Sequence, residues 1–109
     1  MELTQEFIDN LSANEVTIMN QIAEQLSIKV SQVSAVIGLF SEGCTVPFIA
    51  RYRKEKTGSL DEVQVREIDH LFTRLKNLET RRIEIIRGIF EQGKLTETLY
   101  ENISRAVSL

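Results

Sequence analysis

The stretch TVPFIARYRKEKTGSLDE, residues 45–62, contains the signals that divide this chain into helices. Thr45 can cap a helix N-terminus, and Pro47 is tolerated in the first turn, where its missing N–H would have no partner. Gly58 can take the left-handed backbone conformation that ends a helix. These signals predict a short helix over about residues 46–54 that ends before Gly58.

A second helix begins directly after this short one. Residues 59–62 match a capping box, in which the Ser59 hydroxyl accepts the N–H of Glu62 and the Glu62 carboxylate accepts the N–H of Ser59. No proline follows, and Gly88 is the only glycine before Gly93. The box therefore predicts a long helix that extends to about Gly93.

The long helix carries an apolar seam with one cation in it. Apolar residues recur along it at steps of three and four, the spacing of a helix that packs along one face. They are Ile68, Leu71, Leu75, Leu78, Ile85 and Ile89. Arg82 occupies the one interior position of the series where an apolar side chain is expected. A group of five basic residues along this helix is interleaved with glutamates, which predicts that most of the group forms a solvated face. They are Arg74, Lys76, Arg81, Arg82 and Arg87.

The segments upstream also show helical spacing, and no stretch alternates apolar and polar residues as a strand would. One helix is predicted over about residues 14–26. A second starts after Ser31 as its N-cap and stops at Gly43. Only residues 27–30 separate the two, and short helices joined so tightly form a helix-turn-helix-like pair.

The two ends of the chain add one short helix each. Residues 1–14 form an N-terminal extension, in which Thr4 can cap a short helix. After Gly93, Thr96 opens a last helix that must fold back against the end of the long one. Its apolar face consists of Leu99, Ile103 and Val107. The predicted fold is all-α: a helix-turn-helix-like pair, a short helix, one long helix and a C-terminal helix folded back on it.

The charge of the chain is unevenly distributed. Its 109 residues suffice for one modest core, and its formal net charge is -3. Residues 1–44 carry one Lys against six acids, whereas residues 45–58 carry four basic residues against one acid, a local charge of +3. No apolar stretch approaches the ~20 residues that cross a bilayer, and no secretory signal is present. We therefore expect a cytoplasmic protein without membrane contact.

The residues needed for catalysis or metal binding are scarce. His70 is the only histidine and Cys44 the only cysteine, so neither a usual zinc ligand set nor a Cys–His pair can be assembled. The glycines are scattered singly, which excludes a phosphate-binding glycine loop. We predict that the chain is not an enzyme and holds no metal or cofactor.

Four basic residues form the candidate nucleic-acid-binding site: Arg51, Arg53, Lys54 and Lys56. With Tyr52 among them, they are residue types that contact phosphates and stack on bases. Two other interpretations remain open. A short amphipathic helix with Phe48 and Ile49 inward, with or without Tyr52, would leave Arg51, Lys54 and Glu55 outward by geometry alone. A scaffold would instead use the arginines in ion pairs within the protein.

Several runs of residues resemble the signature of the Tex family, bacterial transcription accessory proteins related to a eukaryotic transcription elongation factor. The matching runs are Glu42-Gly43, residues 45–55, Thr57-Gly58 and Leu60-Asp61-Glu62. The resemblance covers about residues 15–109 and implies a Tex-type, all-helical N-terminal domain of a longer protein. Family members continue into a ribonuclease-H-like domain, helix-hairpin-helix elements and an OB-fold domain that binds RNA and single-stranded DNA.

The resemblance implies a function in the context of that longer protein. We expect a fragment that contributes to binding of RNA or single-stranded DNA, with RNA polymerase or the transcription machinery as a further partner. The alternative is a structural scaffold that packs against the missing ribonuclease-H-like and OB-fold domains or mediates protein–protein contact. We also expect the fragment to self-associate through the long helix, whose apolar face its short partners cover incompletely.

Overall fold

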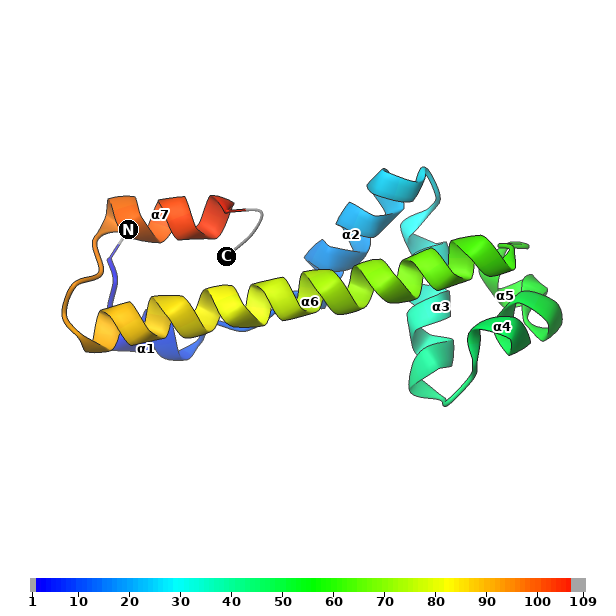
Figure 1. The fold of residues 1–109 in the computed structure, drawn as a ribbon, viewed down its shortest axis with the longest axis horizontal. Helices are drawn as coiled ribbons and strands as arrows, with labels where there is room; N and C mark the ends of the chain where they lie inside the picture. The colour runs from blue at the N-terminus through cyan, green and yellow to red at the C-terminus, as the bar shows by residue number, and fades with distance from the viewer. Residues whose placement is uncertain (1, 107–109) are drawn as a thin grey trace. The chain divides into compact units, whose positions relative to one another are not determined.

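The computed structural model describes residues 2–106, and all regular structure within them is α-helical (Figure 1). The helices are α1 (Gln5–Asp9), α2 (Glu15–Leu26), α3 (Val30–Ser41), α4 (Val46–Tyr52), α5 (Lys54–Thr57), α6 (Glu62–Glu91) and α7 (Glu97–Arg105). The predicted all-α fold is confirmed, including the long helix α6 and the C-terminal helix α7 that packs on it. Val107, predicted to lie on the last helix, is outside the described residues.

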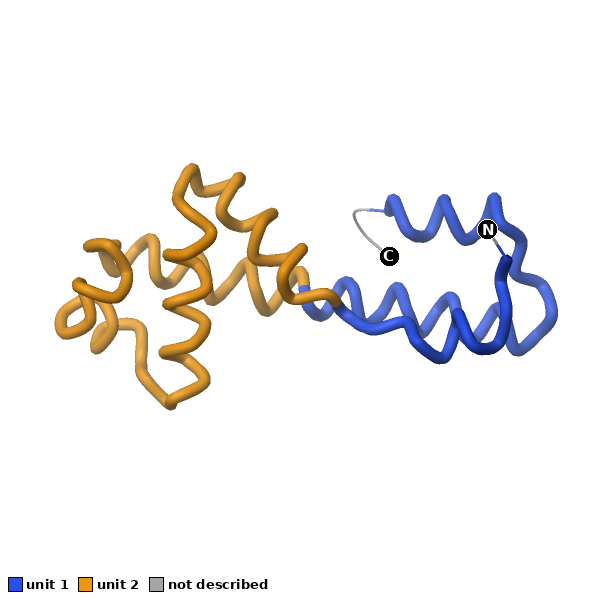
Figure 2. Tube along the Cα trace, turned by 180° about the vertical axis from the view of Figure 1, so that it is seen from behind, with its two compact units in different colours: residues 1–13, 76–109 blue, residues 14–75 orange. Residues whose placement is uncertain are grey.

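The chain divides into two compact units, which Figure 2 colours separately. Unit 2 is Asn14–Leu75 and contains α2 to α5 with the first half of α6. Unit 1 combines Met1–Ala13 with Lys76–Leu109, so α1 and α7 pack with the second half of α6. Each unit has a hydrophobic core of its own.

The core of unit 2 takes one face from each of its longer helices. Ile18 and Ile22 of α2, Val33 and Val36 of α3, and Ile68 of α6 belong to one cluster and are at most 1% exposed. The first two lie four residues apart and the next two lie three apart, so each pair shares one side of its helix. The apolar residues whose helical spacing was seen in the sequence are therefore the ones that form the core of this unit.

The predicted tight connection between α2 and α3 is present. Ser27 follows α2 in the left-handed conformation, with φ 55°. α3 then begins at Val30, so the prediction that Ser31 caps it is wrong, because Ser31 lies inside the first turn. The N-terminus of α3 is instead stabilised by Gln32, whose Oε1 accepts the N–H of Lys29 at 3.0 Å.

The start of α6 also differs from the prediction. Gly58 and Ser59 both have positive φ, 68° and 67°. The Ser59 N–H closes α5 by donating to the carbonyl oxygen of Lys54 at 2.9 Å, so it is not available for the predicted capping box. The box forms two residues later. Asp61 Oδ1 accepts the N–H of Gln64 at 2.8 Å, and Gln64 Oε1 accepts the N–H of Asp61 at 3.0 Å.

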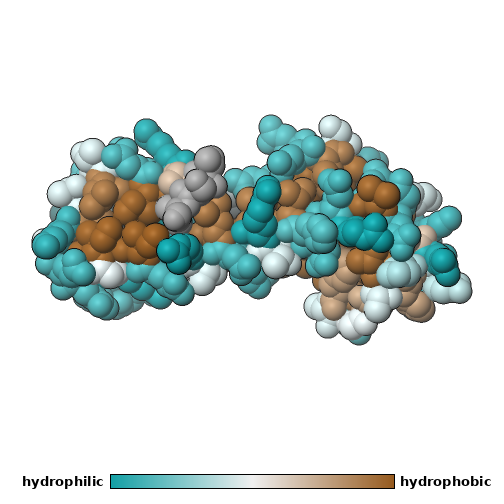
Figure 3. Space-filling view, viewed as in Figure 1, coloured by the Kyte–Doolittle hydropathy of each residue, from teal (hydrophilic) through white to brown (hydrophobic). Residues whose placement is uncertain are grey.

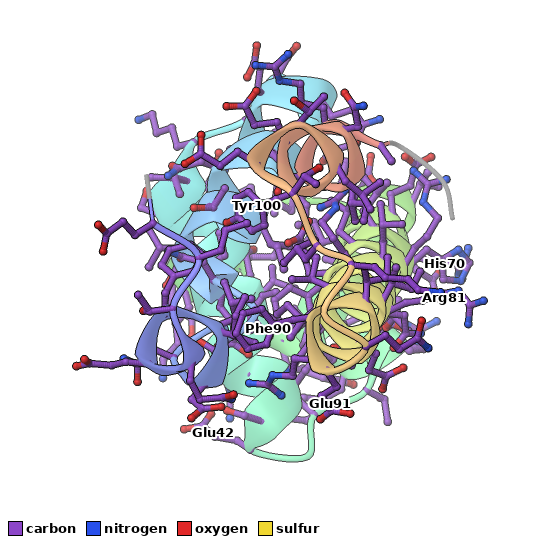
Figure 4. The ribbon with its side chains drawn as sticks, turned by 90° about the vertical axis from the view of Figure 1, so that its left-hand side faces the viewer. Glu42, His70, Arg81, Phe90, Glu91 and Tyr100 are labelled. Atoms are coloured by element: carbon purple, nitrogen blue, oxygen red, sulfur yellow. The ribbon has the colours of Figure 1, made fainter. Side chains whose placement is uncertain are left out.

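The core of unit 1 joins α1, α6 and α7. Its buried residues, one from each helix, are Ile8, Ile86 and Ile103. The rings of Phe7 and Tyr100 meet edge to face with centroids 5.5 Å apart. Figure 4 shows Tyr100 and Phe90 pointing toward the space between these helices. Figure 3 shows apolar side chains of α6 and α7 at the surface on the left of the view, so the apolar face of α6 is covered incompletely in this unit.

Two arginines of α6 bind the ends of the neighbouring helices in unit 1. The Nη2 of Arg87 donates to the carbonyl oxygen of Leu11 at 3.0 Å, and its Nε donates to that of Ile8 at 3.4 Å. Arg82 reaches the end of α7 in the same way. The last carbonyls of a helix lack intrahelical partners, which these guanidinium groups supply. Arg74, Lys76 and Arg81 are exposed, so the prediction of a solvated face holds for most of the group, and Arg82 and Arg87 are its exceptions.

Candidate nucleic-acid interface

The candidate site lies on α4 and α5 of unit 2. Thr45 caps α4 as predicted, since its Oγ1 accepts the N–H of Phe48 at 3.4 Å, and Pro47 lies in the first turn. Ile49 and Ala50 are only 0% and 8% exposed, so they anchor the helix in the core. Val46 is half-buried against the same core, whereas Arg51 on α4 and Lys54 and Lys56 on α5 are exposed to solvent.

The predicted helix over residues 46–54 is two helices that meet at Arg53. This residue has φ -131° and ψ 31°, and it is both the C-cap of α4 and the N-cap of α5. Its N–H donates to the carbonyl oxygen of Ile49 at 3.1 Å, and its carbonyl oxygen accepts the N–H of Thr57 at 3.2 Å. The backbone therefore leaves the helical path within the basic cluster.

A side-chain amide of α3 forms a hydrogen bond with the end of α5. The Nε2 of Gln32 donates to the carbonyl oxygen of Thr57 at 2.9 Å. Thr57 is the buried end of α5, with 0% exposure. Gly58 follows, and a Cβ there would lie 2.7 Å from the same Nε2. The position of α5 thus depends on a contact with a residue 25 positions earlier in the chain.

Two aromatic rings lie on the solvent side of α4. Phe48 is 37% exposed and Tyr52 is 61% exposed. Their ring centroids are 5.3 Å apart and their planes are inclined by 48°. The expected inward position is therefore wrong for Phe48 and also for Tyr52, whereas Ile49 is buried as expected. Residues four apart share one side of a helix, and Ile49 with Ala50 already occupies the inner side.

The side chain of Arg53 is engaged within the chain. Its Cζ lies 5.0 Å from the centroid of the Phe48 ring, within the range of a cation–π contact. Its Nη1 also donates to the carbonyl oxygen of Tyr52 at 3.0 Å. Arg53 is half-buried, unlike the other three candidate cations.

Those three cations, Arg51, Lys54 and Lys56, are open to a ligand. Each is exposed, and no acidic side chain in the described part of the chain forms an ion pair with any of them. The structure thus divides the four predicted site residues into three free cations and Arg53, which is held against the aromatic pair. Sequence reasoning missed the pairing of Phe48 with Tyr52, although their four-residue spacing could have indicated it.

His70 and Cys44, which the sequence analysis did not assign to a catalytic or metal site, do not belong to the basic cluster. His70 is exposed and extends away from α6 (Figure 4). Cys44 is a free, half-buried thiol that packs against the core of unit 2. Within residues 2–106 no group of three His, Cys, Asp or Glu side chains could hold a metal ion. No helix in that range is long and apolar enough to span a membrane.

The chain matches a family model described as the Tex-like protein N-terminal domain over residues 16–90. It is 47% identical over 87 residues to Protein YhgF of Escherichia coli, which covers 80% of this chain. It is 42% identical over 91 residues, 84% of this chain, to Transcriptional accessory protein Tex of Neisseria gonorrhoeae. The human S1 RNA-binding domain-containing protein 1 is 32% identical over 78 residues, 72% of this chain. The chain spans only 11%, 12% and 8% of these three relatives.

Proposed function

Because this chain belongs to the family of Tex-like proteins and matches the model of their N-terminal domain, we propose that it is a helical module that contacts nucleic acid through Arg51, Lys54 and Lys56. The family resemblance read from the sequence is confirmed, and with it the relationship to transcription accessory proteins. The proposed ligands are RNA and single-stranded DNA.

The observation that carries the proposal is a group of exposed, unpaired cations in an acidic chain. The net charge is -3, yet residues 45–58 carry four basic residues and one acid, which gives +3. Cations that neutralise phosphates release counterions, and this release supplies most of the affinity of non-specific binding. Since α4 and α5 are anchored by buried residues, a ligand can meet these cations without breaking contacts inside unit 2.

The names of the relatives agree with this ligand class. One is named for a transcriptional accessory role and another for an S1 RNA-binding domain. We propose that the module adds phosphate contacts to a strand held by a longer protein. RNA polymerase or another part of the transcription machinery is a further proposed partner. The proposal consists of binding and includes no catalytic step.

Fluorescence anisotropy with labelled single-stranded RNA and DNA at low salt tests the proposal. We expect a triple variant, Arg51→Ala with Lys54→Ala and Lys56→Ala, to bind more weakly than the unmodified chain. The slope of log K against log salt should fall by about 2, because each phosphate contact on a single strand contributes about 0.7. All three side chains are exposed, so the variant should keep the helical circular dichroism spectrum.

A matched control removes three other exposed cations of unit 2: Lys29, Arg66 and Arg74. Arg66 has an exposed ion pair with Glu62 at 3.5 Å, and pairs of this kind contribute little to stability. The control changes the net charge by the same amount, so a general charge effect would weaken binding equally in both variants. Equal losses, no binding at all, or binding unaffected by the first triple variant would contradict the proposal.

The exposed aromatic pair favours a second candidate function, the docking of another protein. Aromatic residues are enriched at the centres of protein interfaces, and Phe48 and Tyr52 are 37% and 61% exposed. In that case the basic and aromatic residues have a structural role, as part of a surface on which another protein or another domain packs. Arg53→Ala would then lower the melting temperature and leave the affinity for nucleic acid unchanged.

A further inference from the structure

The Tyr52 ring lies mostly in solvent in the middle of the basic cluster. Its exposure is 61%, and it directly follows Arg51 and precedes the break at Arg53. An aromatic side chain stabilises a fold mainly through the area that it buries. Because most of this ring is unburied, its contribution to folding is small, and the ring remains accessible to a ligand.

The ring is nevertheless held in place from one side. The Phe48 ring lies beside it, with centroids 5.3 Å apart. The guanidinium of Arg53 lies 5.0 Å from the Phe48 ring centroid, and the same group donates to the Tyr52 carbonyl oxygen at 3.0 Å. The Phe48 ring is therefore close to both the Arg53 guanidinium and the Tyr52 ring. A ring ordered before binding loses less conformational entropy when it meets a ligand.

Cations flank this ring along the chain on both sides. Arg51 precedes Tyr52, and Lys54 and Lys56 follow the break, all three exposed. Proteins that bind single strands combine cations that follow the phosphates with aromatic rings on which bases stack. In a duplex the base faces are covered by their neighbours, so a surface ring can stack only on unpaired bases. The arrangement fits a single strand better than a duplex.

We propose that Tyr52 stacks on an unpaired base and that Arg53 is a positioning residue, which holds Phe48 and thereby the orientation of Tyr52. This inference rests on the proposed function, since it describes how the same surface engages its ligand. It assigns phosphate contact to Arg51, Lys54 and Lys56 and assigns discrimination between paired and unpaired bases to Tyr52.

The test compares two fluorescein-labelled strands of equal length and charge, oligothymidylate and an oligomer of abasic deoxyribose phosphates. We expect Tyr52→Ala to weaken binding of oligothymidylate roughly 5- to 150-fold, the range that corresponds to loss of one stacked base. Its affinity for the abasic strand should stay unchanged, because that strand offers no base. Tyr52→Phe, which keeps the ring, should retain the preference for oligothymidylate.

Tyrosine emission gives an independent readout. The chain has two tyrosines and no tryptophan, so a Tyr100→Phe variant reports Tyr52 alone. Phenylalanine at that position keeps a ring against Phe7. Oligothymidylate should quench the emission at saturation, whereas the abasic strand should leave it unchanged. Quenching by both strands, or by neither while both bind, would overturn the proposal.

Arg53→Lys tests the positioning role. The substitution keeps the charge but removes the planar group that lies over Phe48. We expect unchanged affinity for the abasic strand and a smaller ratio of oligothymidylate to abasic affinity. A purely structural role would lower the melting temperature without changing that ratio.

If neither strand binds the unmodified chain, the proposed function itself fails. If both bind equally and Tyr52→Ala has no effect, only the stacking inference fails.

Discussion

The Nε of Arg82 donates a hydrogen bond of 2.8 Å to the carbonyl oxygen of Ile103, which joins α6 to the end of α7. The same guanidinium also donates to the carbonyl oxygen of Ala106 and to the carboxylate of Glu79. Its side chain is 11% exposed. The cation in the apolar seam thus serves as the cap of a neighbouring helix, and its charge is balanced by a glutamate one turn earlier.

Replacing Arg82 should therefore destabilise unit 1 although Met would restore the apolar pattern of the seam. We expect Arg82→Met to lower the free energy of unfolding by about 2–3 kcal/mol, because it removes the side-chain donors to the carbonyl oxygens of Ile103 and Ala106 and leaves the Glu79 carboxylate without its cationic partner. Urea unfolding followed by circular dichroism measures the change. Arg81→Ala is the matched control, since Arg81 is exposed and should matter by less than about 0.5 kcal/mol. If this position favoured an apolar residue, Arg82→Met would instead raise the free energy of unfolding, which would contradict the prediction.

A substitution at Gly58 should cost more than one at Gly43. Both glycines have positive φ, 68° and 89°, so alanine is strained at either position by about 1–2 kcal/mol. Only at Gly58 would the added Cβ meet another group, the Gln32 Nε2 at 2.7 Å. We expect Gly58→Ala to exceed Gly43→Ala by about 1 kcal/mol in urea unfolding.

The double variant Gly58→Ala with Gln32→Ala isolates that extra cost. Removing the Gln32 side chain removes the close contact but also the hydrogen bond to Thr57 at 2.9 Å. The two substitutions share this contact, so their effects should sum to more than the effect of the double variant. Strict additivity would show that the Gln32 amide moves aside without cost.

Mutations distinguish the N-cap of α6 that the structure shows, Asp61, from the one predicted from the sequence, Ser59. Asp61 accepts the N–H of Gln64 at 2.8 Å, whereas the Ser59 N–H is used by α5. We expect Asp61→Ala to lower the free energy of unfolding by about 1 kcal/mol, the usual effect of losing an N-cap. Ser59→Ala should change it by less than about 0.5 kcal/mol. Thermal melts of both variants measure the difference, and a larger loss at Ser59 would contradict the observed start of α6.

Self-association remains a proposal that the surface of unit 1 supports. Apolar side chains of α6 and α7 are open on the face in Figure 3. We expect the weight-average mass in sedimentation equilibrium to rise with protein concentration. Leu78 of the α6 seam is half-buried, so Leu78→Gln should reduce the association with little loss of helical signal. A chain that stays monomeric at high concentration would contradict the proposal.

The helices could be predicted because their signals are local. The spacing of Ile18 and Ile22 and the cap at Thr45 depend on residues within one or two turns, and the structure confirms both. The capping box at Ser59 was wrong because a competing local motif, the left-handed end of α5, uses the same backbone N–H. A capping pattern does not show which of two adjacent helices takes a shared residue.

The candidate site could be predicted only in part, because contacts distant in sequence shape it. The positions of the four cations followed from the sequence, but the division between free cations and the engaged Arg53 did not. That division depends on the break at Arg53, and the anchor of α5 is an amide on Gln32, 25 residues before Thr57. Arg82 was misread for the same reason, since its partner Ile103 lies 21 residues away.

Because α4 and α5 are short, the proposed interface cannot be moved to another protein as a short peptide. They have 7 and 4 residues, whereas an isolated helix in water needs roughly 12–15 residues to be even marginally stable. A synthetic peptide with the sequence of residues 45–58 would keep every charge and both rings but would not keep their arrangement. The surface that presents Tyr52 is therefore a property of the folded unit, and it cannot be carried to another protein as a linear tag.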